Sequence, residues 1–172
     1  MRLFIAINFT RGMKRALMAG VSSLRAQSHG GSFTREENLH LTLAFIGESE
    51  RAEDISRIIE KCACPPFGIS LGGSGRFGDL WWAGLAPCPQ LDALAKALRT
   101  ELKLAGFEPD EKPFRAHITL ARRLRPAGNV SLSLPPCSMT VHRVSLMKSE
   151  RINGHMKYTE VYGLGLGEGE RI

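Results

Sequence analysis

Long apolar runs are missing from this chain. Among its 172 residues, no run approaches the roughly 18 consecutive apolar residues that a helix needs to cross a bilayer. The apolar stretch at residues 3–7 is also too short for the hydrophobic part of a secretory signal peptide. The sequence therefore predicts a cytoplasmic protein that does not span a membrane.

Cysteine is also scarce. The four cysteines, Cys62, Cys64, Cys88 and Cys137, are irregularly spaced. Without a secretion signal, this pattern favours reduced thiols over a disulfide framework. Cys62 and Cys64 are separated by one residue, whereas metal-binding cysteine pairs usually have a two-residue spacer. We therefore expect no metal site there.

The composition is that of a folded protein with an excess of positive charge. A hydrophobic content of 43% over 172 residues is enough for one compact domain, or for two small lobes that share a core. The net charge is +6 and the isoelectric point is near 9.5. An anionic partner is the natural expectation, although many basic proteins bind nothing acidic.

A short motif occurs twice. His40 is followed at two residues by Thr42, and His117 is followed in the same way by Thr119. Each pair lies in an apolar run, at residues 40–47 and 116–122, that is typical of a buried strand. Side chains at i and i+2 share one face of a strand, so each histidine should point the same way as its threonine. The intervening Leu41, with Leu43 and Phe45, should point the other way and pack against helices.

Two such pairs brought face to face would make a site for phosphoester chemistry without a metal. Histidine, with a pKa of about 6.5, can give or take a proton near neutral pH. Threonine hydroxyls can donate hydrogen bonds to an oxyanion. The alternative is that each histidine is a buried, hydrogen-bonded core residue and each threonine an ordinary strand former. Occurrence of the motif twice argues against that alternative.

The remaining sequence alternates between strand and helix patterns. Strands are predicted at residues 1–8, 32–35, 67–71, 80–85, 139–149 and 158–164, and helices between residues 13 and 30, at 48–61 and at 89–105. The glycine-rich residues 72–78 could cradle a phosphate, but they lack the lysine of a P-loop, and a hairpin connection is the better interpretation. Asn153-Gly154 predicts a turn, residues 122–136 a basic loop, and residues 163–170 a loose tail.

This order predicts an α+β fold. Each motif strand follows a strand and a helix, and the separation of His40 from His117 suits the length of one lobe. We expect residues 1–172 to form a single domain of two lobes, each contributing one motif. The lobes would be related by a pseudo-two-fold duplication, with antiparallel sheets lining a central cleft and helices on the outer faces.

At these residues the chain resembles the 2H phosphoesterase superfamily, which is defined by two His-x-Thr motifs. Within that superfamily it is similar to the bacterial RNA 2',3'-cyclic phosphodiesterases, also called 2'-5' RNA ligases. The segments RLFIAI, ENLHLTLAFIGE, GFEPDEKPFRAHITLAR and VHRVSLMKS carry the resemblance, in the order expected of that family and over nearly the whole chain.

The resemblance implies a bilobal enzyme with no metal and no cofactor. It implies hydrolysis of a 2',3'-cyclic phosphate at an RNA end to a 2'-phosphate, and a slow, ATP-independent joining of RNA ends through a 2'-5' linkage. By the same resemblance, His40 is the general acid that donates a proton and His117 the general base that accepts one. The sequence alone could not order the two histidines.

Thr42 and Thr119 are expected to bind the non-bridging phosphate oxygens. Arg122 could add a cationic donor, although it could equally face outward. Arg123 and Arg125 in the basic loop could follow RNA phosphates or simply be solvated.

Several residues lie outside the motifs. His29, His142 and His155 are expected at the surface or in loops. Trp81 and Trp82 are adjacent on a strand, so they should face opposite sides and at most one could stack on a base.

Two alternative functions stay open from the sequence. One is an enzyme for a small cyclic phosphate, such as a nucleotide or an ADP-ribose derivative. The other is a non-catalytic module that binds RNA ends. We expect a monomer in either case.

Overall fold

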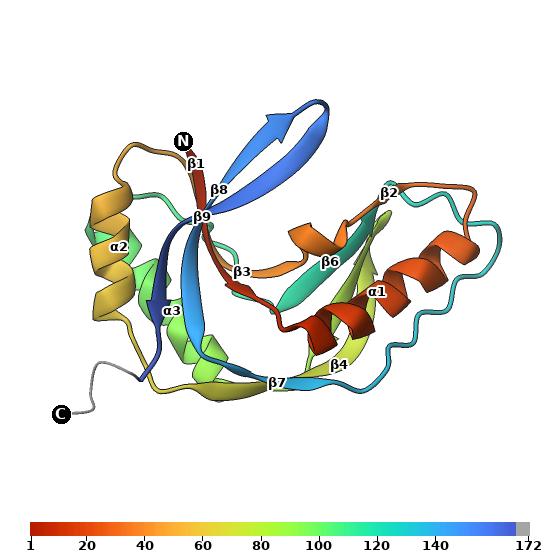
Figure 1. The fold of residues 1–172 in the computed structure, drawn as a ribbon, viewed down its shortest axis with the longest axis horizontal. Coiled ribbons are helices and arrows are strands. Elements are labelled where there is room, and N and C mark those ends of the chain that lie inside the picture. Colours follow the sequence, from red (N-terminus) through yellow and green to blue (C-terminus); the bar gives the residue numbers. More distant parts are fainter. Residues whose placement is uncertain (168–172) are drawn as a thin grey trace.

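The computed structural model describes residues 1–167, and its helices and strands alternate as the sequence predicts (Figure 1). The helices are α1 (Arg11–Ala26), the short 3-10 helix η1 (Glu36–Asn38), α2 (Ala52–Lys61) and α3 (Pro89–Leu104). The strands are β1 (Arg2–Asn8), β2 (Ser32–Phe33), β3 (His40–Glu48), β4 (Phe67–Phe77), β5 (Leu80–Leu85), β6 (His117–Arg122), β7 (Ser138–Val141), β8 (Arg143–Ile152) and β9 (His155–Gly165).

Three predicted segments need correction. The glycine-rich residues 72–77 lie inside β4 and are not a connection, because the hairpin turn is made by Gly78 and Asp79. The predicted strand at 139–149 is interrupted at His142 into β7 and β8, which pair in different sheets. The predicted loose tail is partly ordered, since β9 extends to Gly165 and Leu166 is buried; residues 168–172 lie outside the described part.

The strands form two antiparallel sheets of matching order. One sheet has the order β3-β1-β8-β9, and the other has the order β2-β6-β5-β4-β7. Apart from the additional edge strand β2, the two orders superimpose when β3 is matched to β6, β1 to β5, β8 to β4 and β9 to β7. Each motif strand therefore occupies the same position in its own sheet, and the predicted pseudo-two-fold duplication is visible in the strand pairing.

The helices cover the sheets in a crossed manner. Helix α1 follows β1 of the first sheet but contacts β6 of the second, whereas α3 follows β5 of the second sheet and contacts β3 of the first. Helix α2 adds contacts to α3, β8 and β9 (Figure 1). The apolar faces of all three helices join residues of both sheets in one continuous buried cluster. We call the opposite face of each sheet, which carries the histidine and threonine, its motif face.

A bulge in each motif strand reverses the alternation of side chains after the threonine. In β3, Ala6 pairs with Thr42 but Ile5 pairs with Ala44, and the consecutive Leu43 and Ala44 are both buried. Phe45 therefore returns to the motif face, opposite Phe4 on β1. The prediction that Phe45 packs against helices is wrong for this reason.

The same irregularity occurs in β6. Trp82 pairs with Thr119 and Trp81 with Ala121, and both Leu120 and Ala121 are buried. Arg122 consequently lies on the motif face, with His117 and Thr119. It does not lie on the opposite face, which carries the buried Leu120 and Ala121.

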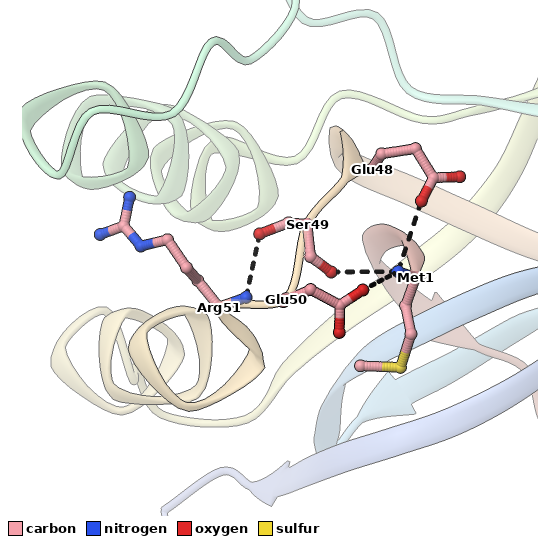
Figure 2. A network of polar contacts seen from close by, with 5 residues as sticks. All are labelled: Met1, Glu48, Ser49, Glu50 and Arg51. Atoms are coloured by element: carbon pink, nitrogen blue, oxygen red, sulfur yellow. Dashed lines mark hydrogen bonds and ion pairs between the residues drawn. The ribbon is translucent and has the colours of Figure 1, made fainter.

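The junction between β3 and α2 is tied to the first residue of the chain (Figure 2). The amino group of Met1 donates hydrogen bonds to Ser49 O at 3.2 Å and to Glu50 Oε1 at 2.8 Å, and it lies 3.3 Å from Glu48 Oε2. The hydrogen bond to Glu50 is the main reason that the pKa of this amino group is raised. Ser49 Oγ also accepts the backbone N–H of Arg51 at 3.1 Å, which satisfies a donor at the start of α2.

Candidate active site

Each motif histidine is oriented by the same local hydrogen bond. His40 Nδ1 lies 2.8 Å from Asn38 O, and His117 Nδ1 lies 2.7 Å from Arg115 O. A carbonyl oxygen only accepts, so in both rings Nδ1 must carry the proton. Nε2 is then the nitrogen that can exchange a proton with a ligand. The two rings are set up identically because each carbonyl lies two residues before its histidine.

Thr42 is in direct contact with the first of these nitrogens. Its Oγ1 lies 2.9 Å from His40 Nε2, so the hydroxyl donates to the neutral ring or accepts from the protonated one. Thr119 lies on the motif face beside His117, and its backbone oxygen accepts a hydrogen bond from Thr34 Oγ1 at 2.9 Å. Among residues 1–167, His117 Nε2 has no hydrogen-bond partner.

The two motifs and Arg122 share one electrostatic environment. The pKa of His40 is lowered, mainly because the ring is buried, and its hydrogen bond to Asn38 opposes this effect. The positive charges of Arg122 and His117 lower it further. The fold therefore brings together three groups that the sequence singled out from segments far apart. It also places β3 against β6.

Aromatic rings enclose His40. The rings of Phe4 and Tyr158 both have their centroids 5.0 Å from that of His40, and they lie 5.2 Å from each other. Phe4 is buried and forms, with Ala6 and Met147, a second small core on the motif face of this sheet. The first imidazole thus sits against apolar rings, which contribute to its desolvation.

His117 has a more open aromatic neighbourhood. Its ring centroid lies 5.7 Å from that of Phe77 and 6.4 Å from that of Trp82, in edge-to-face geometry. Phe77 is 46% exposed. The two halves are therefore alike in backbone and motif but differ in how far their aromatic rings reach solvent.

A second layer of contacts links the site to the β8–β9 hairpin. Asn38, whose carbonyl holds His40, also donates from Nδ2 to Met156 O at 3.0 Å. Arg35 Nη2 lies 2.9 Å from His155 Nδ1, at the start of β9. This hairpin is the long arm that projects beyond the rest of the molecule near η1 (Figure 1).

Sequence reasoning missed Phe4, Tyr158, Phe77 and the role of Asn38. Phe77 was placed in a connecting segment because the glycines beside it hid the strand pattern. Phe77 and Gly75 are two residues apart, so they lie on the same face of a strand, and both pair with the strand at 80–85. That spacing could have indicated that residues 75–77 form one strand of a hairpin. No sequence signal joins Phe4 or Tyr158 to His40, because strand order and curvature bring them together.

The other predicted residues behave largely as expected. His29, His142 and His155 are exposed, and the four cysteines are free thiols. Trp82 lies on the motif face of its sheet and Trp81 contributes to the main core, so the two face opposite sides. In the basic loop, Arg123 and Arg125 are exposed, and Arg125 donates to His29 O at 3.2 Å.

Three other features of the described residues concern metals, membranes and surface hollows. Across residues 1–167, no three histidine, cysteine or acidic side chains converge as a metal site would require. None of the helices in that range is long and apolar enough to cross a membrane. Two surface hollows are lined by residues of α2, α3 and β9, and neither includes a motif histidine.

The structure has two matching antiparallel sheets, and each presents a histidine and a threonine from an equivalent strand. This arrangement defines the class of 2H phosphoesterases. A family model described as the 2'-5' RNA ligase superfamily matches residues 14–153. The chain belongs to this superfamily, and the resemblance inferred from its sequence is confirmed.

Relatives and solved structures agree with this assignment. The RNA 2',3'-cyclic phosphodiesterase of Thermotoga maritima is 35% identical over 133 residues, which cover 71% of this chain and 70% of the relative. The enzyme of the same name from Escherichia coli K12 is 29% identical over 167 residues and 92% of each chain. Among solved structures, a protein of Thermus thermophilus matches with a TM-score of 0.86 and 30% identity over 96% of this chain and 98% of that one. E. coli LigT complexed with 3'-AMP matches with a TM-score of 0.81 and 29% identity over 97% and 98%.

Proposed function

We propose that this protein hydrolyses 2',3'-cyclic phosphate ends of RNA to 2'-phosphates by acid and base catalysis with two histidines. The single observation that carries the proposal is the paired placement of the imidazoles. Each has its Nδ1 proton held by a backbone carbonyl, and the charges of both Arg122 and His117 act on His40. The names of the relatives supply the reaction class.

The chemistry needs one proton removed and one delivered. Water must lose a proton as it attacks phosphorus, and the 3' oxygen must gain one as its bond to phosphorus breaks. Nε2 of one histidine would accept the first proton and Nε2 of the other would donate the second. Thr42, Thr119 and Arg122 would donate hydrogen bonds to the non-bridging oxygens, where negative charge increases in the transition state. The same steps with a 5' hydroxyl in place of water would form a bond from that hydroxyl to phosphorus, break the bond to the 3' oxygen, and so join two RNA ends through a 2'-5' linkage.

The resemblance assigns His40 as the donor and His117 as the acceptor. The lowered pKa of His40 favours its neutral form in the free protein, which would suit an acceptor better. A bound phosphodiester is negatively charged and would favour protonation of His40 again. We therefore keep the assignment as a proposal and test the order directly.

The first experiment measures hydrolysis of an oligonucleotide that ends in a 2',3'-cyclic phosphate, in the presence of EDTA. His40→Ala and His117→Ala should each reduce kcat by about 10²- to 10⁴-fold, because each removes a positioned proton-transfer group. His142→Ala, which removes an exposed histidine outside the site, is the matched control and should retain the wild-type rate. The product should carry a 2'-phosphate. Wild-type rates in both motif variants would rule out the mechanism.

The order of the histidines can be tested with a substrate whose 3' bridging oxygen is replaced by sulfur. A thiolate leaves without protonation, since thiols have a pKa of about 8.5. The variant that lacks the proton donor should regain most of its rate on this substrate, whereas the variant that lacks the acceptor should stay slow. Recovery in His117→Ala instead of His40→Ala would reverse the assignment.

The alternative substrate is a small cyclic phosphate. The complex of E. coli LigT with 3'-AMP shows that this relative holds a mononucleotide. A kcat/KM for a cyclic mononucleotide equal to that for the oligonucleotide end would favour a small substrate. Tight binding of the RNA end without turnover would favour a binding module.

We also propose that residues 1–172 act as one domain in which each sheet supplies one motif.

A further inference from the structure

Positive charge is unevenly distributed along this chain. Residues 1–35 contain six arginine and lysine residues, residues 112–149 contain seven, and neither segment has an aspartate or a glutamate. The rest of the chain carries ten basic and all 17 acidic residues. Helix α1 and strand β2 of the first segment both contact β6 of the second. The fold therefore joins the two acid-free segments at the strand that carries His117.

Exposed arginines gather where these segments meet. We call them the arginine edge, and they are Arg25, Arg122, Arg123 and Arg125. Arg25 lies in the last turn of α1, and its guanidinium is 4.8 Å from the ring centroid of Phe33 on β2. Phe33 pairs with Ala121 on β6, next to Arg122. The edge lies on the side of the molecule that carries α1 and β2, away from α2 and α3 (Figure 1).

The protein does not neutralise the charges of this edge. Within residues 1–167, none of the four guanidinium groups forms an ion pair with a carboxylate. Asp79 approaches the edge through its backbone, since its carbonyl oxygen accepts the N–H of Leu124 at 3.2 Å. In the β8–β9 hairpin, by contrast, Lys148 pairs with Glu150 at 2.9 Å. A polyanion therefore meets an excess of positive charge at the arginine edge.

Arg123 has a backbone conformation that arginine rarely adopts. Its φ is +54°, and the other non-glycine residue with positive φ among residues 1–167 is Asn153, in a turn where asparagine is favoured. This conformation costs more for arginine than for glycine or asparagine. The exposed Arg123 side chain makes no hydrogen bond or ion pair with residues 1–167 that would offset the cost. A ligand explains an arginine at this position better than the fold does.

We propose that the arginine edge binds phosphates of the RNA strand a few nucleotides before its cyclic phosphate end. This inference rests on the proposed function. Arg122 connects the edge to the site, because it lies on the motif face and its charge acts on His40. Arg123 lies six residues beyond His117. At about 3.3 Å per residue, the two are roughly 20 Å apart along the chain.

That separation decides which phosphates the edge can reach. The side chain of Arg123 is too short to contact a phosphate held at the histidines, so it would contact phosphates further upstream. Contacts with phosphates carry no information about the bases. The edge would therefore favour a long RNA end of any sequence over a short one.

The test compares a dinucleotide and an octanucleotide that both end in a 2',3'-cyclic phosphate. Arg123→Asn should raise KM for the octanucleotide about fivefold, with kcat changed less than twofold, and should leave both constants for the dinucleotide unchanged. For the octanucleotide, the slope of log kcat/KM against log salt concentration should become shallower by about 0.7, the value for one phosphate contact of a single strand. Arg123→Lys keeps the charge and should retain most of the wild-type affinity.

The same variant separates binding from folding. Asparagine tolerates the left-handed conformation better than arginine, so the Tm of Arg123→Asn should be unchanged or higher. A lower Tm with equal losses on both substrates would overturn the proposal, because Arg123 would then support the fold. An unchanged KM for the octanucleotide would also overturn it and leave the edge merely solvated.

Lys157→Gln is the matched control. Lys157 is exposed on β9 in the hairpin that projects near η1, and the substitution removes one positive charge, as Arg123→Asn does. It should leave KM for both substrates at the wild-type value. A fivefold rise for the octanucleotide in Lys157→Gln, with none in Arg123→Asn, would overturn the proposal and place the RNA along the hairpin.

Failure of the proposed function can be told apart from failure of this inference. If the wild type cleaves neither substrate, the proposed function fails. Binding of an octanucleotide that carries a 2'-phosphate, measured by fluorescence anisotropy, still tests the edge. An affinity about fivefold weaker in Arg123→Asn would support the edge, and an unaffected affinity would overturn it.

Discussion

At the level of single residues, the two motif histidines differ in environment although they share their backbone geometry. Both donate Nδ1–H to the carbonyl two residues earlier, but His40 lies against Phe4 and Tyr158 whereas His117 lies beside the partly open Phe77. Desolvation and two positive neighbours all disfavour the charged form of His40. The surroundings of the first histidine therefore lower its pKa, although both histidines belong to the same His-x-Thr pattern.

The pKa of His40 should rise when the charge of Arg122 is removed. In the wild type it should lie below the usual value of about 6.5. Arg122→Gln removes a positive charge that opposes protonation, so the pKa should move upward, whereas Arg122→Lys keeps the charge and should leave it nearly unchanged. A titration of the His40 ring resonances by NMR measures both. A pKa that is the same in Arg122→Gln and in the wild type would show that Arg122 points away from the site.

At the level of elements, the site depends on strand irregularities and on one hairpin. The bulges after Thr42 and Thr119 turn Phe45 and Arg122 to the motif faces, which a regular strand would not do. The β8–β9 hairpin brings Tyr158 to His40 and is held at η1 by Asn38. A short 3-10 turn thus connects the histidine and the hairpin.

Asn38→Ala should loosen this connection without removing the carbonyl that holds His40. The variant loses the 3.0 Å hydrogen bond from Nδ2 to Met156 O, which should lower the free energy of unfolding by about 1 kcal/mol. Amides near Met156 should exchange faster with deuterium, because the hairpin is less restrained. Glu37→Ala, on the same turn, removes only an exposed 3.9 Å ion pair with Arg35 and should change stability by less than about 0.5 kcal/mol. Unchanged exchange in Asn38→Ala would mean that the hairpin is held by its other contacts.

At the level of the whole molecule, the crossed helices join the two halves. Helix α1 leaves the first sheet to cover β6, and α3 leaves the second to cover β3, so neither half has its own complete core. Leu17 on α1 and Leu98 on α3 are fully buried in the same cluster. The relative position of the two histidines is set by this shared core.

The protein should therefore unfold in one cooperative transition. Leu17→Ala and Leu98→Ala should each lower the free energy of unfolding by about 2 to 5 kcal/mol, because both leave a cavity in one core. Urea denaturation should be followed by far-ultraviolet circular dichroism, which reports on both halves, and by fluorescence of Trp81 and Trp82, which both lie in β5. Transitions that separate in either variant would show that the two sheets unfold independently.

Local pattern was sufficient to predict much of this structure from the sequence. The helices at α1, α2 and α3 and the motif strands follow from apolar periodicity, and the repeated His-x-Thr indicated two equivalent strands. The predictions failed where local pattern was ambiguous. The glycines of β4 resembled a loop because they lack side chains to alternate, and a strand interruption at His142 has no signal in a run of β-forming residues.

By itself, the sequence determined the elements, the superfamily and the candidate histidines and threonines, because these depend on residues close together in the chain. Only the tertiary structure decided the crossed helices, the strand order, the orientation of Phe45 and Arg122, and the rings around each histidine. Those features depend on pairing between distant segments, and a one-residue bulge moves every later side chain of a strand to the opposite face. The different environments of His40 and His117 therefore come from the packing around two nearly identical motifs.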